Sequence, residues 1–127
     1  MPQGDIHIRA YHLATTPLRR WLLSRLRSQQ RTPVTGLFLH RVADDFPNPW
    51  SMTVEQFDCT LDWLQTHIDL VSLAEAQRRI RYGNSGRIAV HLSFDDGYAD
   101  NCLHAIPELL RRKIPFSYFV TTHHVRH

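Results

Sequence analysis

The segment from Ile88 to Phe94, with the acidic pair that follows it, constrains the fold of this chain more than any other stretch. Large apolar residues alternate with small or polar ones along it, which is the period of a β-strand with a buried face. Asp95, Asp96 and Gly97 follow without a break. Gly97 frees the backbone, so both carboxylates can turn toward one cleft. Because α/β enzymes place metal ligands and acid–base groups at the C-terminal ends of parallel strands, we expect a functional site here.

An Asp-Gly turn after an apolar strand is also typical of a β-hairpin. The residues beyond the turn favour a helix instead, because apolar side chains recur at helical spacing between Asp100 and Lys113. Pro107 is expected to kink this helix or to restart it at a first-turn position. Residues 114–121 are expected to form a second strand. Strand, acidic turn, helix and strand make a βαβ unit, so we predict an α/β fold with parallel strands.

The chain before the acidic pair predicts one further strand of the core. Residues 35–42 are mostly apolar and are followed by a loop rich in Asp and Pro at residues 43–49. His40 lies near the end of this strand. The sequence leaves two interpretations of His40 open, a residue that faces the cleft and a hydrogen-bonded histidine of the core.

Two helices are expected between that loop and the organising strand. Residues 53–56, Thr-Val-Glu-Gln, form a capping-box pattern, and an apolar face continues to about His67. Residues 69–71 are expected to be a short extended piece. Residues 72–75, Ser-Leu-Ala-Glu, repeat the capping-box pattern, and the second helix is expected to end at the glycines of residues 83–86.

Composition excludes several classes of protein. No run of about 18 apolar residues is present, so no membrane span is expected. The first residues lack the basic-then-apolar order of a signal peptide, which favours a cytoplasmic or membrane-peripheral location. The two cysteines, Cys59 and Cys102, predict no disulfide framework and are interpreted as reduced thiols that pack on apolar helix faces.

The positive charge of the chain is concentrated near its start. Residues 1–33 contain six arginines and a single acidic residue, Asp5. The segment from Pro17 to Arg31 predicts a basic helix with apolar residues along one side. One interpretation is peripheral contact with an anionic membrane surface; the other is a leader helix that packs on the domain, or a partly disordered arm. We expect no nucleic-acid partner, because the rest of the chain supplies no basic face or aromatic platform.

Five segments of the chain, spread over roughly residues 34–123, together resemble the polysaccharide deacetylase family, the NodB-homology group of carbohydrate esterases. The order of these segments is the order in which the family has them. They are Leu-Phe-Leu-His-Arg-Val at 37–42, Phe57 with Leu-Asp-Trp-Leu at 61–64, Val-Ser-Leu at 71–73, Leu-Ser-Phe-Asp-Asp-Gly-Tyr at 92–98, and Ile-Pro-Phe-Ser-Tyr-Phe-Val-Thr-Thr at 114–122.

The resemblance implies a partial (β/α) barrel and a metal-dependent hydrolase. Members of the family remove acetyl groups from N-acetylated sugars of a polysaccharide or oligosaccharide with a divalent metal, often zinc. By this resemblance, Asp95 is the general base and Asp96 is a metal ligand. The chemistry is consistent with these roles, because a metal lowers the pKa of its water while a carboxylate takes the proton.

The chain departs from the family pattern in its remaining metal ligands. The family takes two further ligands from a His-x-x-x-His motif that lies one strand beyond the aspartates. His123 and His127 have this spacing, but they follow the second strand of the βαβ unit. They are therefore either a ligand pair or part of a loop at the edge of the cleft. We expect residues 1–33 to be an N-terminal extension and residues 34–127 to be the N-terminal part of a deacetylase domain whose other ligands lie outside this chain.

Two alternatives to a deacetylase remain open from the residues alone. Phosphatases of the haloacid-dehalogenase type also end a buried strand with aspartates and a glycine. They use Asp-x-Asp-Gly with magnesium, however, whereas this chain has no spacer between Asp95 and Asp96. The other alternative is a catalytically inactive structural fragment, whose open strand edges would favour self-association.

Overall fold

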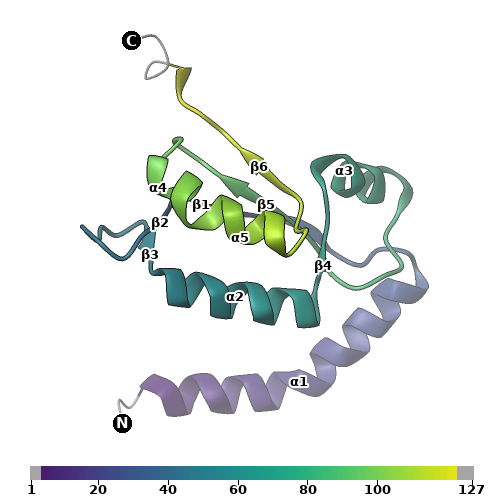
Figure 1. The fold of residues 1–127 in the computed structure, drawn as a ribbon. Coiled ribbons are helices and arrows are strands. Elements are labelled where there is room, and N and C mark those ends of the chain that lie inside the picture. The colour runs from purple at the N-terminus through teal and green to yellow at the C-terminus, as the bar shows by residue number, and fades with distance from the viewer. Residues whose placement is uncertain (1–3, 123–127) are drawn as a thin grey trace.

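The computed structural model describes residues 4–122, with side chains described from residue 14 onward. Helices and strands alternate along this part of the chain (Figure 1). The helices are α1 (Gly4–Ser28), α2 (Val54–His67), α3 (Leu73–Tyr82), α4 (Ala99–Leu103) and α5 (Ala105–Arg111); the strands are β1 (Val34–Leu39), β2 (Arg41–Val42), β3 (Ser51–Met52), β4 (Asp69–Leu70), β5 (Ala89–Phe94) and β6 (Phe116–Tyr118).

The organising segment of the sequence is the central strand of the main sheet. β5 pairs with β1 along its whole length, and on its other side it pairs with β4 and then β6. Every one of these pairings is parallel. The hairpin alternative is therefore wrong, and the predicted βαβ unit is confirmed.

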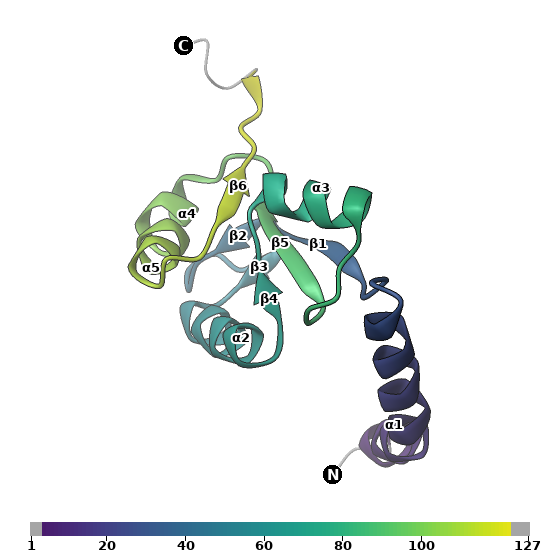
Figure 2. The same cartoon turned by 90° about the vertical axis from the view of Figure 1, so that its right-hand side faces the viewer.

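The alternation of β5 separates two layers of helices. Val90, Leu92 and Phe94 point into the main core, where α2 and α5 contribute Phe57, Leu61 and Leu109 among others. Ala89 points to the opposite face and packs with Ala76 of α3 and with Val71, which lies between β4 and α3. Figure 2 shows α3 on one side of the sheet and α2 and α5 on the other. Each fully buried Leu or Phe side chain contributes about 1.5–3 kcal/mol.

The two predicted capping boxes form to different extents. At α2 both halves are present, since Thr53 Oγ1 accepts from the Gln56 N–H and Gln56 Oε1 accepts from the Thr53 N–H. At α3, Ser72 Oγ accepts from the Glu75 N–H, but the Glu75 carboxylate binds Arg78 and Arg79 instead. The second box is therefore half formed, because arginine is a stronger partner for a carboxylate than a backbone N–H.

The first predicted strand is broken at His40. β1 ends at Leu39, and after His40 the chain leaves the main sheet as β2, which pairs with β3. The cause lies 59 residues further on, where Asn101 accepts the Val42 N–H and Asp100 binds Arg41. These long-range hydrogen bonds take the place of ladder bonds that a continued strand would have made.

The helix after the acidic pair is also interrupted. α4 ends at Leu103 and α5 begins at Ala105, which puts Pro107 in the first turn of the second helix, one of its two predicted positions. Cys59 and Cys102 are free as predicted, but both are exposed. Their assignment to packed faces was wrong, because α2 and α4 bury other sides against the sheet.

The basic N-terminal segment forms α1, which extends beyond the predicted helix toward the start of the chain. In Figure 2 this helix projects away from the sheet and its covering helices. Leu18, Trp21 and Leu22 are 64%, 57% and 47% exposed, so the packed leader helix that we considered is not observed for these side chains. Across residues 4–122, no helix combines the length and the apolar character that crossing a bilayer requires.

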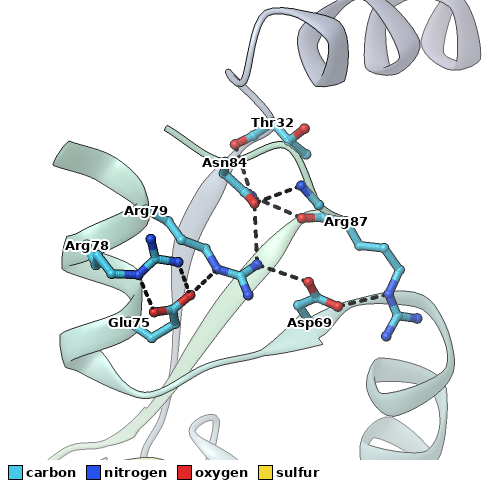
Figure 3. Close-up of polar contacts among 8 residues, drawn as sticks. Thr32, Asp69, Glu75, Arg78, Arg79, Asn84 and Arg87 are labelled. Carbon is cyan, nitrogen blue, oxygen red and sulfur yellow. Dashed lines mark hydrogen bonds and ion pairs between the residues drawn. The ribbon is translucent and has the colours of Figure 1, made fainter. Parts of the chain in front are cut away.

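A polar network holds α3 to the N-terminal end of the sheet (Figure 3). Asp69 accepts from Arg79 and Arg87, both at 2.9 Å, and Arg79 also binds Glu75 at 2.7 Å. Burial opposes the ionisation of Asp69, but the bonds from Arg79 and Arg87 outweigh it and lower its pKa. Arg78 and Arg79 lower the pKa of Glu75 to about 2. Each carboxylate at this end of the sheet is thus matched by guanidinium groups.

Candidate functional site

Asp95 and Asp96 lie at the C-terminal edge of the main sheet, as the sequence predicts. β1 and β5 end in register, with Leu39 opposite Phe94. The Asp95 N–H then donates to the Leu39 carbonyl at 2.9 Å, and the Phe119 N–H donates to the Phe94 carbonyl at 2.8 Å. The acidic pair is therefore placed between the end of β1 and the chain that leaves β6.

The turn that carries the pair has an unusual backbone. Asp96 has a φ of 70° and Gly97 a φ of 74°, both in the left-handed region that L side chains rarely adopt. A Cβ added to Gly97 would lie 3.1 Å from Val120 Cγ1, so the turn also needs glycine for lack of space. A cavity of about 390 Å³ opens beside it, lined by Asp96, Gly97, Tyr98, Val120 and Thr121. Uncommon conformations of this kind concentrate at functional sites.

His40 joins the acidic pair from the neighbouring strand. Its Nε2 lies 3.9 Å from Asp96 Oδ2, and its side chain is 21% exposed. The ring also lies against Trp50, with centroids 5.1 Å apart. Of the two interpretations that the sequence leaves open, the cleft-facing residue is the observed one. The break between β1 and β2 could not be read from the local pattern, and it is this break that turns His40 toward Asp96.

A buried clamp fixes the strand end that bears His40. Asn101 is fully buried, and its Nδ2 donates to the His40 carbonyl at 2.6 Å while its Oδ1 accepts the Val42 N–H at 2.9 Å. Arg41 Nε donates to Asp100 Oδ2 at 2.5 Å. Asp100 and Asn101 belong to α4, the helix that follows the acidic turn. His40 and Asp96 therefore sit on two elements that are joined directly to each other.

The residues of the rim supply only part of a metal site. Among the side chains of residues 14–122, no group of three His, Cys, Asp or Glu is placed to hold a metal ion. Catalytic zinc usually takes three protein ligands, so the described side chains do not by themselves fit a complete zinc centre. His123 and His127, the alternative ligand pair, lie outside the described residues.

Comparisons with solved structures agree with the fold. IcaB from Ammonifex degensii superposes with a TM-score of 0.62 at 30% identity, over 70% of this chain and 38% of IcaB. A de-N-acetylase from Aggregatibacter actinomycetemcomitans superposes with a TM-score of 0.56 at 24% identity, over 67% of this chain and 36% of that protein. No family model and no curated protein sequence matches the chain.

These superpositions show an architecture that the chain shares with part of each solved structure. Both solved structures are members of the polysaccharide deacetylase family, so the resemblance that the sequence motifs carry is confirmed. The parallel α/β architecture, which corresponds to part of the family's (β/α) barrel, is confirmed with it. The chain spans less than two-fifths of the length of either matched protein. The matches favour this family over the phosphatase alternative.

Proposed function

We propose that this chain carries part of the active site of a metal-dependent deacetylase that hydrolyses the acetamide C–N bond of N-acetylated sugars in a polysaccharide or oligosaccharide. The observation that carries the proposal is the rim itself. His40 and Asp96 lie 3.9 Å apart at the C-terminal edge of a parallel sheet, where the Asp95 backbone is bonded to the end of β1, and the matched structures belong to polysaccharide deacetylases.

Each of the three residues has a proposed role. Asp95 accepts the proton of the attacking water, because a carboxylate at the end of a strand is a suitable general base. Asp96 is the ligand that this chain contributes to a divalent metal, which we expect to be zinc. When bound, such a metal polarises the acetyl carbonyl. His40, whose Nε2 lies 3.9 Å from Asp96 Oδ2, is proposed to orient that carboxylate.

The remaining metal ligands are proposed to come from outside residues 4–122. Isolated, the chain should therefore bind zinc weakly, since one carboxylate ligand and a neighbouring base do not make a tetrahedral site. Within a complete deacetylase domain, zinc should bind tightly and Asp96→Ala should abolish that binding.

Calorimetric titration with zinc and acetate release from N-acetylglucosamine oligomers test the proposal together. The wild-type domain should release acetate, Asp96→Ala should lose both metal and activity, and Asp95→Asn should keep the metal but lose turnover. Sub-micromolar binding to the 127-residue chain that survives Asp96→Ala but disappears in His123→Ala would show that the terminal histidines form the real site.

We also propose that α1 contacts an anionic membrane surface. Leu18, Trp21 and Leu22 are exposed on the helix, and the Arg25 guanidinium lies 5.4 Å from the centre of the Trp21 ring. Arginines whose stems cover apolar residues while their charges reach outward are typical of helices that lie in a membrane interface.

Sedimentation with vesicles tests this contact. The wild-type chain should bind phosphatidylglycerol vesicles more tightly than phosphatidylcholine vesicles. Arg20→Gln with Arg27→Gln should weaken binding about 30-fold, since each charge near an anionic surface contributes about 1 kcal/mol. Arg78→Gln is the matched control, because Arg78 is exposed but paired with Glu75 on α3. Equal binding to both kinds of vesicle would contradict the proposal.

A further inference from the structure

The loop between β2 and β3 presents two large aromatic side chains to solvent beside the acidic rim. We refer to residues 44–50 as the aromatic loop. Phe46 is 84% exposed and Trp50 is 64% exposed. Exposing aromatic surface of this size costs free energy that burial would recover, so a reason outside the packing of the described fold is needed.

The aromatic loop is held rigidly from beneath. The buried Arg41 guanidinium donates to the carbonyls of Asp45 and Phe46 at 2.8 and 2.7 Å while it binds Asp100 of α4. At the other end of the loop, Asn48 Oδ1 accepts the Trp50 N–H at 2.8 Å. Through Arg41, the backbone of the aromatic loop is thus joined to the helix that follows the acidic turn.

Phe46 also carries backbone strain. Its φ is 43°, a value that is a genuine outlier for a bulky residue. The Phe46 carbonyl accepts a hydrogen bond from the buried Arg41 guanidinium. This bond holds the loop in its strained conformation. Strain that the surrounding structure maintains is characteristic of ligand-binding segments.

A chain of ring contacts links the aromatic loop to the acidic pair. Trp50 lies against His40, with ring centroids 5.1 Å apart and planes at 38°, and His40 Nε2 lies 3.9 Å from Asp96 Oδ2. One face of the indole is directed at the imidazole. With 64% of the residue exposed, the rest of the ring is accessible next to the place where a substrate would react.

We infer that the aromatic loop is a sugar-binding subsite. In it Trp50 stacks on a pyranose ring of a polysaccharide whose neighbouring N-acetyl group reaches the acidic pair, and Phe46 of the same loop adds apolar surface. The C–H groups of a pyranose face are weakly positive and apolar, which suits the negative face of an aromatic ring. The rigid loop preorganises the contact, so little entropy is lost on binding. This inference rests on the proposed deacetylase function for its choice of ligand.

Binding of an N-acetylglucosamine pentamer to the full 127-residue chain, followed by saturation-transfer NMR and calorimetry, tests the subsite without requiring turnover. Trp50→Ala should raise the Kd at least about 10-fold, and Phe46→Ala by a smaller factor, as truncation of an aromatic anchor does at other interfaces. Trp63→Ala is the matched control. Trp63 is 55% exposed and also stacks on a histidine, His67, at 4.7 Å, but it lies on α2 away from the acidic pair.

Two outcomes would overturn the subsite: no detectable pentamer binding by the wild-type chain, or equal weakening by Trp50→Ala and Trp63→Ala. Loss of folding in Trp50→Ala would also count against it, since the ring would then serve packing; Trp50→Phe, which keeps an aromatic face, should retain most of the affinity. Failure of the proposed function is distinguishable. In that case the pentamer binds through Trp50 but a complete domain releases no acetate.

Discussion

The two ends of the main sheet treat their carboxylates in opposite ways. At the N-terminal end, Asp69 and Glu75 are bound by Arg79 and its neighbours at hydrogen-bonding distance. At the C-terminal end, no arginine or lysine within residues 14–122 forms an ion pair with Asp95 or Asp96. Asp96 instead faces His40, whose Nε2 lies 3.9 Å from Asp96 Oδ2. The carboxylates at the N-terminal end are thus neutralised by arginines of the fold. Asp95 and Asp96 have no such partner within the described residues and can interact with a ligand.

The backbone conformation also differs between the two ends of the sheet. Asp69 begins a regular strand, whereas Asp96 has a φ of 70°, which costs free energy that no described ion pair offsets. The difference shows that the role of an acidic residue near a sheet depends on whether a basic side chain is bonded to it. Paired carboxylates hold elements together, while unpaired carboxylates on a strained turn are the candidates for chemistry.

The largest effect on stability is expected from Asn101→Leu. This change leaves the Val42 N–H and the His40 carbonyl without the partners that Asn101 supplies, and unsatisfied buried groups cost about 1–3 kcal/mol each. We expect a loss of roughly 3 kcal/mol in the free energy of unfolding, measured with urea. Unchanged stability would show that the clamp does not hold the His40 strand end.

Asp69→Asn should be next in size. It removes the charge that binds Arg79 and Arg87 and should cost about 2 kcal/mol, in the range for hydrogen bonds to charged groups. Asp44→Asn is a useful control, because that exposed side chain accepts a hydrogen bond from the Val54 N–H and, within residues 14–122, forms no ion pair. If the two variants lost the same free energy of unfolding in urea, the ion pairs of Asp69 would contribute no more to stability than an exposed aspartate does.

Gly97→Ala sharpens the comparison at the other end. The new methyl group would meet Val120 at 3.1 Å on a backbone with a φ of 74°, so we expect a loss of about 1–2 kcal/mol. Gly36→Ala is the matched control, since nothing lies within 4 Å of a Cβ there. A destabilisation of the same size at both glycines would show that the acidic turn is not specially constrained.

The smallest effect is expected from acid. The pKa of Glu75 is lowered by Arg78 and Arg79 to about 2, and that of Glu108 by Arg111 and Arg112 to about 2, from an ordinary value of 4.5. The unfolded chain therefore binds more protons below pH 4.5, so these groups stabilise the fold above that value and stop doing so as the pH falls toward 2. Thermal melts should show a decline in this window that Glu75→Gln reduces.

Local pattern was sufficient for the central strand, for the acidic turn and for the start of α2, because period, turn chemistry and capping act within a few residues. It was not sufficient for His40. The strand break beside it depends on Asp100 and Asn101, which lie some 60 residues away in the sequence. A hydrogen bond over such a distance leaves no periodic signal.

The second helix shows the same limit. Helical spacing puts Leu73, Ala76 and Ile80 near one face of α3, yet Leu73 and Ile80 are 46% and 69% exposed while Ala76 is buried. The orientation of α3 is set by the binding of Arg79 to Asp69 across the sheet edge, which helical spacing does not encode. The roles of Asp95 and Asp96 stay predictions, supported by their position.

The central claim is that Asp95 and Asp96, which no arginine or lysine within residues 14–122 neutralises, serve catalysis and contribute little to the stability of the fold. Acetate release from N-acetylglucosamine oligomers by Asp95→Asn, assayed in the complete deacetylase domain, tests it most directly. We expect a loss of at least about 100-fold, the usual contribution of a general base, with the urea unfolding midpoint unchanged. Acetate release at the wild-type rate, or a loss that only follows a fall in stability, would contradict the account.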